Sequence, residues 1–232
     1  MIDNSSKFKK IKAELDEQDA TLVAVSKLQS TQKIMELYQL GHRDFGENYV
    51  QELVEKETLL PKDIRWHFIG HLQSNKVKHI ASFVHLIQGV DSEKLLKEIN
   101  KQAAKNSRTI DCLLQVHIAE EDTKFGFSEE DLHRFFSDQY ISYTNIRIRG
   151  LMGMSTFSDD NEKVRNEFKS LKNLFDKYFT PGQEVNINYP SSYAEPGNGY
   201  LLSMGMSGDY KVAIEEGSNM VRIGSLLFGN RP

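Results

Sequence analysis

Eight short apolar runs alternate with helical patterns along the 232 residues, and this alternation is the feature that most constrains the fold. Helices between the runs begin at Ser or Thr caps and end at Gly or Pro, as helix termini require. Strict alternation predicts parallel strands joined by helical crossovers. Eight units predict an α/β fold with a closed (β/α)₈ barrel, and an open doubly wound sheet is the alternative. The predicted strands are 21–26, 43–46, 64–69, 84–88, 110–118, 146–152, 200–204 and 220–223.

The whole chain, 1–232, is expected to form one domain, because no linker or internal repeat interrupts the alternation. Residues 1–19 are expected to contain an N-terminal helix. The segment 183–199, QEVNINYPSSYAEPGNG, is long for a barrel connection. It is predicted to be either a functional loop or a mobile surface insertion.

Composition narrows the class of partner. A formal net charge of −4 and a pI of about 6.0 give no basic surface for general nucleic-acid or membrane binding. No apolar run approaches the length of a membrane span, and the N-terminus has no apolar signal core. We therefore expect a cytoplasmic protein. The single cysteine, Cys112, excludes an internal disulfide.

Glycines and hydroxyls follow the last two predicted strands, where a barrel often binds phosphate. Strand 200–204 runs into SMGMSGD, and strand 220–223 runs into GSLLFG. Glycines allow the backbone to approach an anion, and helix N-termini favour negative charge. The sequence predicts a phosphate site without a Walker-type motif, while the alternative is that these glycines only serve tight turns.

Lys27 ends the first predicted strand, TLVAVS, and is either a solvated side chain or a working amine. A lysine in a partly dry pocket has a lowered pKa and can form a Schiff base with an aldehyde. Together with a phosphate cradle it would suit pyridoxal 5′-phosphate. Arg222 of the last strand could then reach the ring nitrogen of the cofactor and keep it unprotonated. An unprotonated ring withdraws electrons less strongly.

Metal binding is the weaker interpretation of the histidines. His67 and His71 lie four residues apart, with His79 and His85 downstream. No motif such as H-E-x-x-H accompanies them, and the first pair falls on a strand end and its loop. We therefore predict no metal.

Taken together, the motifs resemble the pyridoxal phosphate homeostasis proteins, also called the YggS/PROSC family. The resemblance covers about residues 20–231 and rests on blocks in this order and spacing: LVAVSK, FGENYVQE, WHFIGHLQSNK, GLMGM and LSMGMSGDYKVAIEEGSNMVRIGSLLFG. The WHFIGHLQSNK and LSMGMS…VRIG blocks are specific in combination.

The resemblance implies a single barrel of the alanine-racemase N-terminal type, fold type III among pyridoxal phosphate proteins. It implies that Lys27 forms the Schiff base and that Arg222 faces the pyridine nitrogen. The phosphate-binding segments are matched by Ser203, Met204, Gly205, Met206, Gly224 and Ser225. Positions around the cofactor are matched by Asn48, His67 and Met154.

The family is thought to bind, store and deliver the cofactor, with apoenzymes as recipients and no established turnover. Racemases of this fold take a second base, a tyrosine, from a separate domain, whereas this chain ends at Pro232. The resemblance therefore implies a monomeric carrier or regulator. The alternative is an amino-acid racemase that uses His67, Tyr189 or Tyr193 as the missing base. A third possibility is a barrel for another phosphate ester.

Three features depart from the family pattern. The first motif usually continues as Thr-Lys-Pro, but here it reads Leu28-Gln29-Ser30. This chain therefore lacks the second basic residue that the family motif has after Lys27. The motif GLMGMST differs after GLM, and the segment 183–199 is longer and more polar than expected.

Overall fold

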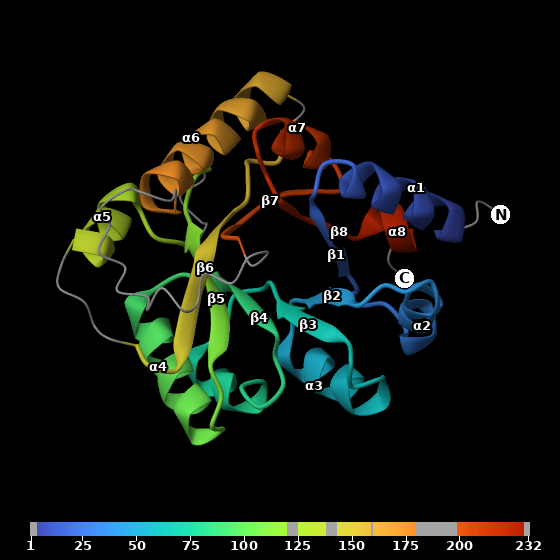
Figure 1. Ribbon diagram of the computed structural model, residues 1–232, viewed down its shortest axis with the longest axis horizontal. Helices are drawn as coiled ribbons and strands as arrows, with labels where there is room; N and C mark the ends of the chain where they lie inside the picture. The colour runs from blue at the N-terminus through green and yellow to red at the C-terminus, as the bar shows by residue number, and fades with distance from the viewer. Residues whose placement is uncertain (1–3, 120–124, 138–142, 159, 180–198, 230–232) are drawn as a thin grey trace.

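The computed structural model describes residues 4–119, 125–137, 143–158, 160–179 and 199–229. Eight parallel strands pair in chain order, and β8 pairs with β1 to close the barrel (Figure 1). This closure confirms the predicted (β/α)₈ barrel and excludes the open sheet. The strands are β1 Thr21–Val25, β2 Asp44–Glu47, β3 Arg65–Phe68, β4 Leu86–Val90, β5 Ile110–Val116, β6 Ile146–Gly153, β7 Leu201–Met206 and β8 Met220–Ile223.

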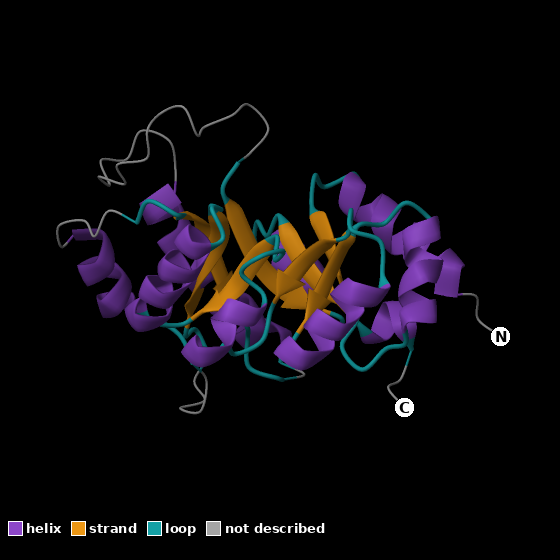
Figure 2. Ribbon diagram, turned by 90° about the horizontal axis from the view of Figure 1, so that it is seen from below, coloured by secondary structure: helices purple, strands orange, loops and turns teal. Residues whose placement is uncertain are grey.

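Helices surround the strands on the outside of the barrel (Figure 2). They are α1 Asn4–Asp16, α2 Thr31–Gln39, α3 Val50–Leu59, α4 Glu93–Lys105, α5 Glu129–Ser137, α6 Asn161–Phe179, α7 Tyr210–Glu215 and α8 Ser225–Phe228. Ser30 caps α2 and Ser92 caps α4, each by accepting a hydrogen bond from a backbone N–H of the first turn. Within the described ranges, no helix combines the length and apolar character needed to cross a membrane.

The connection between β3 and β4 differs from the helix predicted there. It contains a six-residue 3₁₀ helix, η1, at Ser74–His79. Short connectors often take this tighter form. Its buried Val77 lies in the main core, and η1 packs against α4.

Alternation along each strand divides the core into two layers. In β3, Trp66 and Phe68 pack outward against the helix layer, while His67 between them lines a cavity within the barrel. In β1, Leu22 and Ala24 belong to the outer layer and Val23 to the interior. The interior apolar layer is small: Val23, Leu86, Leu113, Met152 and Met220. Polar side chains therefore occupy much of the space at both ends of the barrel.

Candidate functional site

Lys27 lies in the turn directly after β1 and is half-buried. The next residue, Leu28, has a φ of 60°, in the left-handed region, so the chain turns sharply away from the strand. The Leu28 backbone N–H donates a 2.6 Å hydrogen bond to Glu52 Oε1 of α3. This contact fixes the turn that presents Lys27.

A buried network of ion pairs and hydrogen bonds holds the residue before the same turn, Ser26. Ser26 Oγ donates to Glu47 Oε1 at 2.6 Å. Lys56 Nζ donates at 2.7 Å to three oxygens: Ser26 O, Glu47 Oε1 and Glu52 Oε1. Burial raises the pKa of Glu47, although the charge of Lys56 opposes the shift. Sequence reasoning missed this network, although the i, i+4 spacing of Glu52 and Lys56 is typical of a helical ion pair.

Arg222 is buried on β8, next to β1, where it pairs in register with Val23. Its Nη1 donates to Ser203 O at 2.8 Å and to Ser203 Oγ at 2.6 Å, and its Nη2 donates to Gly153 O at 2.9 Å. All three acceptors are uncharged. Burial lowers the pKa of the guanidinium to about 10, and the charge of Asp209 opposes the shift. Arg222 is therefore still cationic at neutral pH.

The predicted phosphate segments come together at the ends of β7 and β8. The Gly224 N–H donates to Ser207 Oγ at 3.2 Å, which joins the two loops. Gly205 has a φ of +93°, and a Cβ there would lie 2.5 Å from that of Ala213, so only glycine fits. Of the remaining predicted residues, Met204 is buried in the outer core, whereas Met206 and Ser225 are exposed. Met204 therefore offers this end of the barrel its backbone rather than its side chain.

Asn48 follows β2 at the same end of the barrel as Lys27. Its Oδ1 is buried and has no hydrogen-bond partner among the described residues. Met154 follows β6 and packs, half-buried, against the interior layer. An unpaired buried oxygen is costly, so Asn48 has the capacity to bind a donor from a ligand.

His67 occupies a different place from the other predicted residues. Its Nε2 lies 3.1 Å from Asp44 Oδ1, and its Nδ1 lies 3.1 Å from Gln88 Nε2. Gln88 Oε1 accepts a 2.7 Å hydrogen bond from Ser203 Oγ, which also binds Arg222. His67 also lines a cavity at the N-terminal end of the barrel. It is thus linked to Arg222 through Gln88 and Ser203, rather than by direct contact.

Several predicted features lie outside the described residues. These are Tyr189 and Tyr193, offered as alternative bases, and the segment 183–198 that contains them. Of that predicted loop, only Gly199 is described, and it is exposed.

The fold and this arrangement of strand ends define a class of protein. The family model for the alanine racemase N-terminal domain matches residues 5–232. An alanine racemase from Clostridium difficile 630 has the same fold, with a TM-score of 0.71 at 16% identity over 100% of this chain and 58% of that chain.

Two further comparisons narrow the class. The pyridoxal phosphate homeostasis protein of Aquifex aeolicus (strain VF5) is 40% identical over 213 residues, 91% of this chain and 87% of the relative. The structure of PipY from Synechococcus elongatus PCC7942 with PLP bound has a TM-score of 0.78 at 29% identity, over 97% of this chain and 100% of that chain. The chain belongs to the family of pyridoxal phosphate homeostasis proteins.

Proposed function

We propose that this protein holds pyridoxal 5′-phosphate as a Schiff base on Lys27 and acts in the homeostasis of that cofactor, as a carrier or regulator without robust catalysis. The observation that carries the proposal is that Lys27, Arg222 and the glycine loops after β7 and β8 all lie at one end of the barrel. The names of the relatives and the PLP bound to PipY support it.

The residues present fit a phosphorylated pyridine aldehyde. Gly205 packs directly against Ala213 of α7, which brings the start of that helix against the loop after β7, and the Asn48 oxygen lacks a partner within the described ranges. A guanidinium has more N–H donors than the three bonds of Arg222 use, and it cannot accept a proton. Arg222 can therefore donate to a ring nitrogen but cannot hold it protonated.

The chain's own residues divide the work. Bound pyridoxal phosphate would supply an aldehyde and a ring that withdraws electrons. Lys27 supplies the amine that condenses with the aldehyde. Arg222 would donate to the ring nitrogen without protonating it, which would weaken the power of the ring to withdraw electrons. The network of Ser26, Glu47 and Lys56 fixes the turn that carries the amine.

Absorbance and covalent trapping test the proposal. We expect a band near ~420 nm on adding the cofactor, because an amine and an aldehyde condense in this pocket. Borohydride followed by peptide mass spectrometry should place the reduced adduct on Lys27. Lys27→Ala should abolish both signals, whereas Lys78→Ala, at an exposed lysine of η1, should retain them. A wild-type protein that shows no such absorbance band after addition of the cofactor would overturn the proposal.

Isotope exchange separates the carrier from the racemase alternative. The cofactor-loaded protein is incubated with single-enantiomer amino acids in deuterated water. A carrier should give no Cα deuteration above that of the free cofactor. Deuteration at enzymatic rates would replace the carrier with an enzyme.

The proposal extends to the proteins that receive the cofactor and to the compartment in which this protein acts. Apoenzymes that need the cofactor are the expected recipients, and the cytoplasm is the expected compartment. Mixing the loaded protein with an apoenzyme tests delivery, since direct transfer makes enzyme activation faster than activation by an equal concentration of free cofactor.

A further inference from the structure

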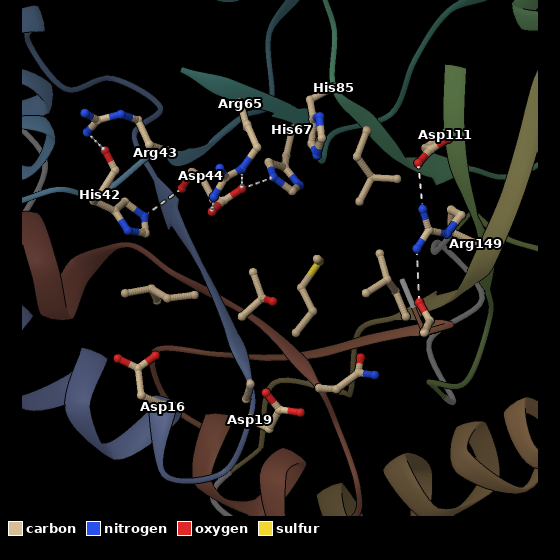
Figure 3. Close-up of a pocket in the computed structure, with 18 of the residues that line it drawn as sticks. Asp16, Asp19, His42, Arg43, Asp44, Arg65, His67, His85, Asp111 and Arg149 are labelled. Atoms are coloured by element: carbon tan, nitrogen blue, oxygen red, sulfur yellow. Dashed lines mark hydrogen bonds and ion pairs between the residues drawn. The ribbon is translucent and has the colours of Figure 1, made fainter. Parts of the chain in front are cut away.

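The N-terminal end of the barrel contains a cavity of about 760 Å³, formed where the strands begin. Residues at or next to the first positions of the strands line it, among them Thr21, Asp44, Arg65, His85 and Asp111. Figure 3 shows the two imidazoles of His67 and His85 side by side next to the Asp44 carboxylate. The cavity is at the opposite end of the strands from Lys27.

Three metal-binding atoms converge on this cavity. Asp44, His67 and His85 each offer one ligand atom, and these atoms lie within 4.8 Å of one another. One pair, His67 Nε2 and Asp44 Oδ1, is 3.1 Å apart. In a tetrahedral zinc site with bonds of about 2.0–2.1 Å, ligand atoms are separated by about 3.3 Å. An ion could therefore enter with small side-chain movements.

Outer contacts already orient two of the three side chains. Gln88 Nε2 lies 3.1 Å from His67 Nδ1, and Arg65 binds both carboxylate oxygens of Asp44, with Nε at 2.7 Å from Oδ1. Metal ligands are usually held by such second contacts. His85 stands edge-on to the His67 ring, with centroids 5.5 Å apart, and its side chain has no hydrogen bond to the described residues. One imidazole nitrogen is thus available beside two pre-oriented ligands.

We propose that Asp44, His67 and His85 bind one divalent transition-metal ion of the zinc class, with a fourth coordination position open to the cavity. The donor set selects the ion. Two imidazoles and one carboxylate suit zinc, cobalt or nickel, whereas calcium and magnesium need more oxygen ligands.

Coordination has a consequence for the hydrogen bonds above the site. An amide nitrogen only donates, so His67 Nδ1 accepts from Gln88 and the neutral ring carries its proton on Nε2. A metal on Nε2 moves this proton to Nδ1. Gln88 must then turn its amide to accept it, and Ser203 loses its acceptor at Gln88 Oε1. The bound and metal-free forms therefore differ in the orientation of one buried amide.

Calorimetric titration tests the site on the full chain after removal of metals with a chelator. Zinc chloride should bind at one equivalent per chain. His85→Gln should weaken this binding by roughly tenfold or more, because one of three ligands is lost. His79→Gln, at an exposed histidine of η1, is the matched control and should leave the binding unchanged. Equal binding by wild type and His85→Gln, or no binding by wild type, would overturn the proposal.

A second measurement needs no variant and does not depend on the folding of one. Cobalt(II) replaces zinc, and its visible d–d absorption reports coordination number. We expect the intense bands of a four- or five-coordinate ion, which added zinc should bleach. The weak spectrum of six-coordinate cobalt, or no change on adding zinc, would count against the site. Neither readout depends on the bound cofactor, so failure here leaves the function proposed for Lys27 untouched.

Discussion

The two ends of the barrel hold their charges in different ways. At the N-terminal end, Asp44 is bound by Arg65, and Asp111 is bound by two further arginines. At the C-terminal end, buried Arg222 is held by uncharged oxygens, and Glu47 Oε2 has no partner in the described ranges. Both ends therefore contain ion pairs, but only the C-terminal end has a buried guanidinium whose hydrogen bonds all go to neutral oxygens. Arg222 thus keeps N–H donors beyond the three bonds it makes, whereas both carboxylate oxygens of Asp44 are already bound by Arg65.

Lys56→Met should have the largest effect, since it removes the cation at the centre of the C-terminal network. Glu47 would then be buried without its charge partner. We expect a loss of about 3–5 kcal/mol in the free energy of unfolding, measured by urea denaturation. Lys62→Met, at an exposed ion pair, is the control and should cost less than about 1 kcal/mol. Equal losses would show that burial of the Lys56 pair does not set the cost of removing it.

His42 should make the N-terminal end sensitive to acid. Burial lowers the pKa of His42 to about 4, against the opposing charge of Asp44, while the unfolded value is about 6.5. The unfolded chain therefore takes up a proton that the folded chain refuses. The stabilisation is complete above pH 6.5 and falls by about 3 kcal/mol as the pH drops towards 4.

His42→Gln tests this directly, because the amide can still donate to the Asp44 carbonyl that His42 Nε2 contacts at 2.8 Å. Unfolding free energies are measured between pH 7 and pH 4.5. The variant should lose less stability than the wild type over this interval. Parallel curves would show that His42 does not cause the acid sensitivity.

Arg222→Ala should affect the C-terminal end without preventing the reaction of Lys27. The cofactor should bind roughly tenfold more weakly, equivalent to about 1.4 kcal/mol, because one charge-assisted contact is lost. The absorbance maximum should also shift, since the ring nitrogen loses its donor. Spectral titration measures both quantities. An unshifted spectrum with unchanged affinity would place Arg222 away from the ring.

Arg65→Lys should have the smallest effect. Arg65 binds Asp44 through two nitrogens, and a lysine can make only one such contact. Because the Arg65 side chain is 48% exposed, we expect a loss of about 1 kcal/mol or less by urea denaturation. A loss matching that of Lys56→Met would mean that the pairs at the N-terminal end matter as much as the buried network.

The sequence was enough to predict the barrel and the residues that lie at the ends of its strands. Alternation of strand and helix patterns has one closed solution for eight units, and β8 at Met220–Ile223 agrees with the predicted 220–223. Lys27 and Arg222 could be singled out because they are charged residues in or next to apolar strands. Gly205 could be singled out because it is a glycine directly after a predicted strand. Their assignment to a cofactor remains a prediction.

Other features could not be found from single positions. Lys56 is in a helix, where a lysine is ordinarily solvated, and only its approach to Ser26 and Glu47 makes it a buried anchor. The position of His67 around the cofactor ring stays a prediction, and the structure places His67 in contact with Asp44 and Gln88. Inward-facing residues of a short strand can serve either end of a barrel, depending on its shear. His67 and Asp44 lie close together because β2 and β3 pair with Asp44 opposite Arg65. The local sequence of either strand does not determine this register.

The chain of hydrogen bonds from Arg222 to Asp44 has a fixed direction. Arg222 donates to Ser203, Ser203 to Gln88, Gln88 to His67, and His67 to Asp44. A guanidinium cannot accept and a carboxylate cannot donate, so the two ends prevent reversal of the whole chain. Such a chain cannot carry a proton through the barrel and reset itself. The orientation of the Ser203 hydroxyl beside Arg222 is therefore tied, through Gln88, to the nitrogen on which His67 carries its proton.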